Sequence, residues 1–200
     1  MPALGITGGI ATGKSTFSEA FCRYLSAGLF DADQCSRDLL ANDAAVRQAV
    51  QDAFGPRAFG PNGHPDRVWL REAVFADSSK RRQLEQILHP AIRAAWTIRA
   101  ADAAATGKWL CVDIPLLYET GAQSQFAAVI VVACSAATQR ARLLEKRQLS
   151  ATIADQILAA QLNLATKIAQ ADHLIWNDSS NSCLDRQARL LAGAFRERNP

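Results

Sequence analysis

The chain has 200 residues, 49% of them hydrophobic and 20% charged, which is typical of a globular protein able to bury a sizeable core. Its formal net charge of +3 is too small to indicate nucleic-acid binding, although it suits a small polyanionic substrate. The 5 cysteines are scattered and include no C-x-x-C pair, which argues against a disulfide framework or a zinc site and favours a reducing compartment.

The N-terminus has no basic region followed by a long apolar one, so the sequence does not indicate a secretory leader. No apolar run approaches the length needed to cross a bilayer. We therefore expect a cytoplasmic protein with no membrane or nucleic-acid partner.

The first element with chemical meaning is the segment Gly8–Ser15, which matches the phosphate-loop pattern G-x-x-x-x-G-K-[ST] at every fixed position. The apolar run 3–7 before it predicts a buried strand. The residues after it predict a helix, because apolar side chains recur there at helical spacing: Phe17, Ala20, Phe21, Tyr24 and Leu25. A glycine loop between a strand and a helix directs backbone N–H groups and the helix dipole at a polyphosphate. The chain is therefore predicted to bind a nucleoside triphosphate.

The loop residues have distinct expected contributions. Lys14 would reach the β- and γ-phosphates, and the Ser15 hydroxyl would be a ligand of Mg²⁺. The full set predicted to surround the phosphates is Gly9, Ile10, Ala11, Thr12, Gly13, Lys14, Ser15 and Thr16.

Residues 27–33 predict a second strand that ends in two acids, Asp31 and Asp33. The carboxyl end of that strand would lie beside the phosphate loop, where Asp33 could accept the proton of an attacking hydroxyl. The spacing is equally compatible with Asp33 capping a helix that begins near Ser36. Arg37, one helical turn later, would pair with Asp33 or hold a substrate phosphate.

From residue 38 to about 105 the apolar periodicity is helical and predicts no strand. A loop rich in glycine and proline covers residues 55–65, and His89–Pro90 is expected to interrupt the last helical pattern. Because the stretch is long for a single crossover between strands, we expect a helical insertion that holds the second substrate. A histidine before a proline is more often structural than catalytic.

Residues 109–113 predict a strand that ends in Asp113, the form of a Walker-B strand whose aspartate helps to hold Mg²⁺. Pro115 ends this strand. The unbroken apolar run 128–134 is typical of a central parallel strand that is covered on both faces.

Residues 138–147 combine a helical pattern with clustered cations. One interpretation is a solvated helix face. The upstream phosphate loop favours a lid, in which Arg140 and Arg142 close over the nucleotide and neutralise the transferring phosphoryl group. A second helical pattern, from Ile153 to Gln161, would form the other arm of the lid. Residues 173–177 then predict a last strand, and residues 184–195 a closing helix.

Taken together, these stretches resemble the dephospho-CoA kinases over nearly the whole chain. The combination of the two-aspartate segment, His-Pro and Pro-Leu-Leu-x-Glu in this order is far more specific than the phosphate loop. The matching positions are Gly5–Ile10 with Gly13–Thr16, Asp31–Asp33 with Arg37, Arg67 with Leu70, Val74–Phe75, Leu88–Pro90, Asp113–Glu119, Ile157–Gln161 and Asn177.

The resemblance implies transfer of the ATP γ-phosphate to the ribose 3′-hydroxyl of dephospho-CoA, giving CoA and ADP with ATP and Mg²⁺ as cofactors. It implies an α/β fold, namely a three-layer P-loop kinase core with a parallel sheet, an inserted helical substrate-binding domain and a helical lid. We expect the nucleotide-binding core at residues 1–34, 106–137 and 166–200, the helical insertion for dephospho-CoA at residues 35–105, and the lid at residues 138–165. A monomer or a weak homo-oligomer is expected.

For this sequence, the resemblance implies that Asp33 is the base for the 3′-hydroxyl. Its role as a helix cap becomes the less favoured alternative. Lys14 and Arg142 join Asp33 as catalytic residues, and Arg140 contacts ATP. Asp113 shares Mg²⁺ with Ser15, through water. The residues implied to face the substrate are Asp33, Arg37, Arg67, His89 and Glu119.

Three positions depart from the family's pattern. Lys146, followed by Arg147, stands where a second lid arginine is usual, and lysine cannot make arginine's planar two-pronged contact. Arg147 could substitute, or Arg140 and Arg142 could suffice. Ala11 and Asp178 stand where glycine and asparagine are frequent, and neither is expected to abolish nucleotide binding.

Two other functions are compatible with the phosphate loop. One is a different small-molecule kinase of this shape, such as a nucleotide or shikimate-type kinase. The other is a nucleotide switch of the GTPase class, although residues 177–180 do not match its Asn-Lys-x-Asp guanine-reading segment.

Overall fold

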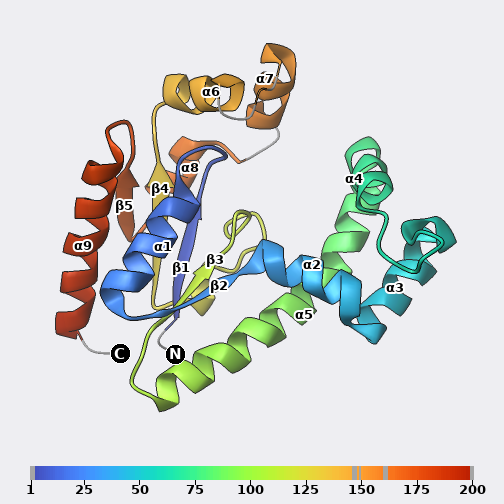
Figure 1. The fold of residues 1–200 in the computed structure, drawn as a ribbon, viewed down its shortest axis with the longest axis horizontal. Coiled ribbons are helices and arrows are strands. Elements are labelled where there is room, and N and C mark those ends of the chain that lie inside the picture. Colours follow the sequence, from blue (N-terminus) through green and yellow to red (C-terminus); the bar gives the residue numbers. More distant parts are fainter. Residues whose placement is uncertain (1–2, 146–147, 149, 160–161, 199–200) are drawn as a thin grey trace. The chain divides into compact units, whose positions relative to one another are not determined.

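The computed structural model describes residues 3–145, 148, 150–159 and 162–198 (Figure 1). The strands are β1 (Ala3–Gly8), β2 (Gly28–Asp31), β3 (Leu110–Asp113), β4 (Ala128–Ala133) and β5 (His173–Trp176). The helices are α1 (Lys14–Leu25), α2 (Ala32–Asn42), α3 (Ala44–Phe54), α4 (Arg67–Ala76), α5 (Ser78–Ala105), α6 (Ala136–Glu145), α7 (Ala151–Ala159), α8 (Leu164–Ala169) and α9 (Asn181–Arg198), with 3₁₀ turns η1 (Pro56–Ala58) and η2 (Gln123–Gln125).

The strands form one sheet in the order β2-β3-β1-β4-β5. β1 pairs in parallel with β3 and β4, and β4 pairs in parallel with β5, so their carboxyl ends share one edge. From β1 the chain leads through α1 to β2, whereas the chain beyond β4 leads the other way, to β5. The crevice between such diverging connections is where open α/β sheets bind ligands. The segment Gly8–Ser15 starts at that point.

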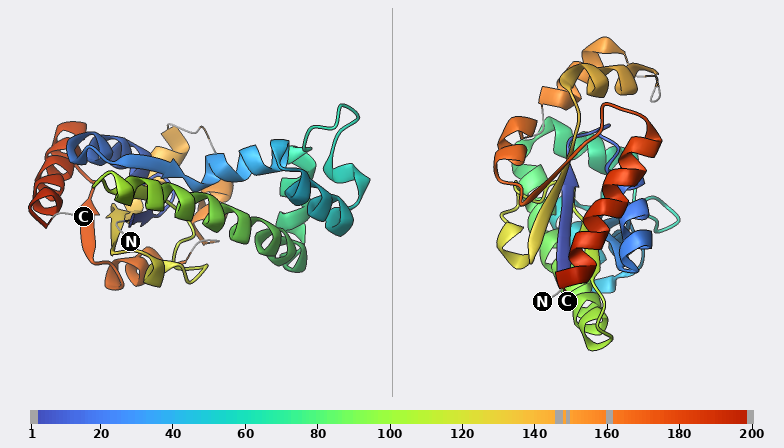
Figure 2. Two further views of the ribbon diagram at one scale, coloured as in Figure 1. Left: turned by 90° about the horizontal axis from the view of Figure 1, so that it is seen from below. Right: turned by 90° about the vertical axis from the view of Figure 1, so that its left-hand side faces the viewer.

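Alternating side chains of β4 supply the core on both faces of the sheet. Helices α1 and α9 lie side by side on one face of the sheet (Figure 2). Ile130 and Val132 pack against them, and Phe21 and Phe195 meet there edge to face with ring centroids 6.0 Å apart. Val129 and the other inward residues of the opposite face pack against α8 and the segment after β3. These three layers confirm the predicted α/β class with its parallel sheet. Each fully buried phenylalanine contributes about 1.5–3 kcal/mol.

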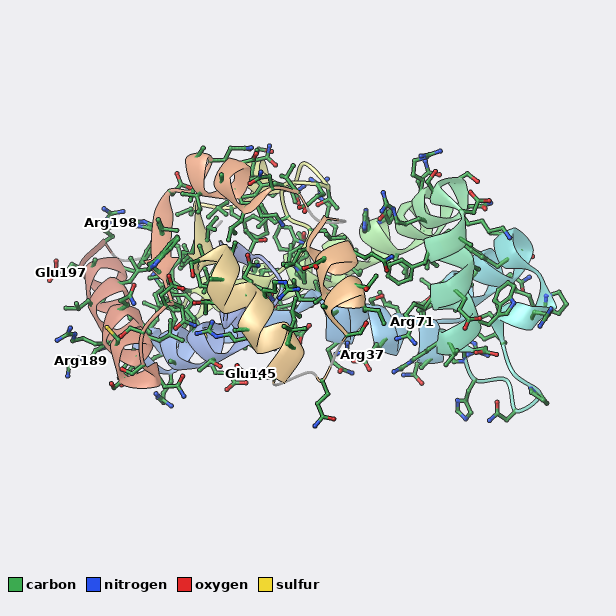
Figure 3. The ribbon with its side chains drawn as sticks, turned by 90° about the horizontal axis from the view of Figure 1, so that it is seen from above. Arg37, Arg71, Glu145, Arg189, Glu197 and Arg198 are labelled. Carbon is green, nitrogen blue, oxygen red and sulfur yellow. The ribbon has the colours of Figure 1, made fainter. Side chains whose placement is uncertain are left out.

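Helix α9 also contacts the outer edge of the sheet at one residue of β5. The Gln187 side chain accepts a hydrogen bond from the Trp176 N–H at 3.2 Å and donates one to the Trp176 carbonyl at 2.9 Å. Gln187 therefore ties α9 to the backbone of the edge strand β5. On the solvent side of α9, charged side chains point outward, as Arg189, Glu197 and Arg198 show in Figure 3.

Residues 31–98 form a second compact unit, distinct from the unit made by residues 1–30 and 99–200. Each of its first helices begins with an aspartate whose side chain accepts a backbone N–H: Asp31 for α2, Asp43 for α3 and Asp66 for α4. The unit has its own apolar core, built from Leu40, Val46, Val50, Ala58, Leu70 and Leu88. The domain boundaries expected from the sequence remain a prediction.

The expected interruption at His89–Pro90 is wrong, because α5 continues through Pro90. Proline inside a helix removes one hydrogen bond and costs about 3 kcal/mol. Leu88 and Trp96 are 7% and 3% exposed, so apolar burial on both sides of Pro90 offsets that cost. Periodicity on each side was a better indicator than the proline between them.

The described part of the chain has no helix long and apolar enough to cross a bilayer. Lys146, Arg147 and the end of the predicted second lid arm, Ala160 and Gln161, lie outside the described residues.

Candidate active site

The loop between β1 and α1 forms an open turn at the start of a helix. Gly13 has a φ of 91°, and its carbonyl accepts the Phe17 N–H at 3.1 Å, the first bond of α1. The first turn of α1 carries no acidic side chain, so nothing there offsets the positive end of the helix dipole. The local structure suits a phosphate group.

Ala11 is a loop residue with left-handed backbone, at a φ of 59°. This conformation costs about 1–2 kcal/mol for a residue with a Cβ atom. We expect Ala11→Gly to raise the free energy of unfolding by at most about 1 kcal/mol, since glycine also gains freedom in the unfolded chain. Urea denaturation measures this change, and a lower free energy for the variant would contradict the loop conformation.

Lys14 and Asp113 meet at the carboxyl ends of β1 and β3. The Lys14 ammonium forms an ion pair with Asp113 Oδ1, and the Ser18 hydroxyl donates to Asp113 Oδ2 at 3.3 Å. Asp113 is only 6% exposed. The structure thus brings together the predicted phosphate lysine and the predicted metal-site aspartate.

The oxygens near this pair are of the kind that Mg²⁺ prefers. The Ser15 hydroxyl lies in the exposed first turn of α1, and the Asp113 carboxylate ends β3. Both are hard oxygen donors. The described residues contain no group of three or more His, Cys, Asp or Glu side chains that could hold a metal. In proteins, Mg²⁺ commonly binds one or two carboxylates together with water and substrate phosphates.

The two predicted lid arginines have different partners. Arg142 lies against the phosphate loop and donates to the Ala11 carbonyl at 3.1 Å and to the Asn177 carbonyl at 2.9 Å. Arg140 pairs with Asp155 of α7 at 2.9 Å, and this hydrogen bond lowers the pKa of Asp155. Arg142 is therefore at the loop, whereas Arg140 joins α6 to α7. A contact of either with ATP stays a prediction.

Asp178 occupies one of the positions that depart from the family's pattern. Its carboxylate accepts the Ser135 N–H, just before α6, at 2.8 Å, and this bond is the main reason why its pKa is lowered. An asparagine would offer the same kind of acceptor through its amide oxygen. The aspartate therefore keeps α6 attached to the end of β5.

Glu119 is paired with Lys167 of α8, a residue that no sequence motif singles out. The Lys167 ammonium is fully buried, lies 2.8 Å from Glu119 Oε1 and donates to the Pro115 carbonyl at 3.0 Å. Lys167 thus fastens the segment after β3 to α8. The available signal was a lone lysine in the otherwise uncharged helix Leu164–Ala169. A role of Glu119 in substrate binding stays a prediction.

We expect Lys167→Met to lower the free energy of unfolding by about 1–3 kcal/mol, because the Pro115 carbonyl loses its donor and Glu119 keeps only the Leu162 N–H at 3.4 Å. Urea denaturation of the full chain measures the loss. Glu119→Gln in the same chain should recover part of it, since the uncompensated charge is then removed. A Lys167→Met chain as stable as the original would contradict the importance of this pair.

The remaining predicted site residues lie in the second unit. Asp33 is exposed in the first turn of α2, and the helix cap is Asp31, which accepts the Gln34 N–H at 2.9 Å. The alternative that Asp33 caps a helix beginning near Ser36 is therefore wrong, because the helix begins earlier. Arg37 donates to the Gln34 side chain at 2.7 Å.

Arg67 and His89 lie on different helices of the same unit. Arg67 is the exposed first residue of α4, and half-buried His89 lies in α5. Burial lowers the pKa of His89, and nearby Glu85 opposes that change. Substrate contacts of both residues stay predictions.

The comparisons with known proteins agree with one another. The family model described as "Dephospho-CoA kinase" matches residues 3–182. A protein of Anaeromyxobacter dehalogenans named "Dephospho-CoA kinase" is 41% identical, covering 96% of this chain and 92% of its own.

Two solved structures share the fold over nearly their whole length. The protein TT1252 from Thermus thermophilus has a TM-score of 0.81 at 25% identity, covering 96% of this chain and 97% of its own. The dephospho-CoA kinase from Campylobacter jejuni has a TM-score of 0.73 at 26% identity, covering 98% of each chain. With its phosphate loop intact and the family model matched from β1 into α9, this chain belongs to the dephospho-CoA kinase family.

Proposed function

We propose that the chain transfers the γ-phosphate of ATP to the ribose 3′-hydroxyl of dephospho-CoA, giving CoA and ADP as the last step of coenzyme A biosynthesis. The observation that carries this proposal is the family match over residues 3–182, which includes the loop, Asp113 and Glu119. Phosphoryl transfer requires little covalent chemistry from a protein. It requires in-line oxygens, neutralised charge and exclusion of water.

Each part of the site has one task in this reaction. The backbone N–H groups of the loop and the Lys14 ammonium hold the β- and γ-phosphates, so Lys14 exchanges its contact with Asp113 for one with phosphate. Ser15, and Asp113 through water, would hold Mg²⁺, which when bound neutralises phosphate charge. Arg142 is placed at the loop to add positive charge as the γ-phosphate departs.

On the acceptor side, Asp33 removes the proton from the 3′-hydroxyl as that oxygen attacks the γ-phosphorus. A carboxylate is suited to this task, because it accepts the proton directly. Arg37, Arg67, His89 and Glu119 would bind the acceptor together with Asp33.

The test is release of ADP from ATP with and without dephospho-CoA, with the product identified by mass. We expect release that depends on dephospho-CoA, a product one phosphate heavier, and loss of turnover when EDTA removes Mg²⁺. Shikimate and nucleoside monophosphates are the control acceptors. Turnover with one of them, and none with dephospho-CoA, would contradict the proposal. A preference for GTP without any acceptor-dependent turnover would instead favour a nucleotide switch.

A further inference from the structure

Two carbonyl groups of the phosphate loop accept hydrogen bonds from amide side chains that are distant in the sequence. Gln139 of α6 donates to the Ile10 carbonyl at 2.8 Å, and Asn177, next to the end of β5, donates to the Thr12 carbonyl at 2.8 Å. Both amides are buried, with Gln139 6% and Asn177 4% exposed. Buried amides that donate to a loop backbone restrict its conformation.

The direction of these carbonyls determines the direction of the neighbouring N–H groups. A peptide group is planar, and its N–H points away from its own C=O. Drawing the Ile10 and Thr12 carbonyls toward Gln139 and Asn177 therefore turns the N–H groups of Ala11 and Gly13 to the opposite side. N–H groups that already point at the anion bind it without the free-energy cost of reorienting them.

The same two amides lie close to where a side chain on Gly9 or Gly13 would begin. A Cβ atom on Gly9 would lie 2.6 Å from Gln139 Nε2, and one on Gly13 would lie 2.2 Å from Asn177 Nδ2. Gly9, unlike Gly13, does not adopt a positive φ. At Gly9 the restriction therefore comes from the Gln139 amide rather than from backbone strain.

We propose that Gln139 and Asn177 are positioning residues for the nucleotide phosphates, and that Gln139 is the reason for glycine at position 9. Neither needs to touch the nucleotide. They set the affinity for ATP through the loop backbone, whereas the acceptor is bound by other residues. The inference rests on the proposed function only in taking ATP as the nucleotide.

The first test compares ATP affinity and acceptor affinity in variants that keep the shape of each side chain. Gln139→Met and Asn177→Leu replace the donating amide with an uncharged apolar group of similar shape, so that no negative charge is added near the phosphates. Each should weaken ATP binding about 3- to 10-fold, the loss expected for one hydrogen bond, while KM for dephospho-CoA stays within about twofold. ATP affinity is measured by calorimetric titration without acceptor. Equal ATP affinity in the variants and the original chain would overturn the proposal.

The second test is a double-mutant cycle between Gly9 and Gln139. Gly9→Ala alone should weaken ATP binding about tenfold, because the new methyl group displaces the amide. In the Gln139→Ala chain the same change should add less than about twofold, since the obstructing atoms are gone. Gly8→Ala is the matched control, because its Cβ would lie 2.3 Å from the Val132 carbonyl, which Gln139→Ala does not remove.

The outcomes separate this inference from the proposed function. If the original chain binds ATP but makes no CoA, the function fails, and the affinities of the variants still decide the inference. Additive effects of Gly9→Ala and Gln139→Ala would overturn the role of Gln139 at position 9. If Gly8→Ala does not fold, the Gln139→Met and Asn177→Leu variants decide the outcome, because they add no bulk.

Discussion

Asp33→Asn is expected to lower kcat about 10²- to 10⁴-fold while the Kd for ATP changes less than about twofold. Asparagine has nearly the same shape as aspartate but cannot accept the proton of the 3′-hydroxyl. Asp33 lies outside the phosphate loop, in the first turn of α2, so we expect no change in the affinity for ATP. Steady-state kinetics with dephospho-CoA gives kcat, and titration of the acceptor-free chain gives the affinity for ATP.

A matched control lies on the same helix. Asp38 is exposed and accepts a hydrogen bond from the Gln34 side chain at 2.8 Å. Asp38→Asn removes the same charge from α2 without touching the proposed base, so its kcat should stay near the original. If Asp33→Asn turns over as fast as Asp38→Asn, then Asp33 is not the base.

Lys14→Ala is expected to lower kcat/KM for ATP at least about 10²- to 10³-fold, through both weaker phosphate binding and slower transfer. The change removes the one side-chain cation of the loop and leaves the Asp113 carboxylate, 6% exposed, without that ammonium. Stability should fall as well, because a buried carboxylate loses its ion-pair partner. Kinetics are therefore measured at a temperature where circular dichroism shows the variant to be folded.

Lys108→Ala is the charge-matched control for this variant. Lys108 is exposed and lies just before β3, at the edge of the sheet opposite to Asp113. It should leave both ATP affinity and turnover near the original values. Unchanged ATP affinity in Lys14→Ala would contradict the phosphate-loop interpretation itself.

The sequence predicted best those features that depend on residues close together in the chain. The phosphate loop was predicted from the fixed spacing of residues within Gly8–Ser15. Strand β4 was predicted from an unbroken apolar run, which is typical of a strand covered on both faces. Both depend on local chemistry that the fold does not override.

The features that the sequence did not predict depend on contacts between distant residues. The Lys167–Glu119 pair joins α8 to the segment after β3, and the local sequence offers only a lone lysine in an uncharged helix, with no indication of its partner. Gln139 has no distinguishing feature in the sequence, and only the fold brings its amide to the Ile10 carbonyl. The prediction at Pro90 was wrong for the opposite reason. Proline usually interrupts a helix, but here burial of the apolar residues on both sides keeps α5 continuous.

The contact between Gln187 and Trp176 has a consequence for the behaviour of the protein at high concentration. An outer strand with open main-chain groups is a template on which another chain can add a strand, the first step toward aggregates. In β5, one amide from α9 occupies both the N–H and the carbonyl that such a strand would need at Trp176. Helix α9 thus blocks strand addition at this position, even though Leu174 and Trp176 leave apolar surface exposed beside it.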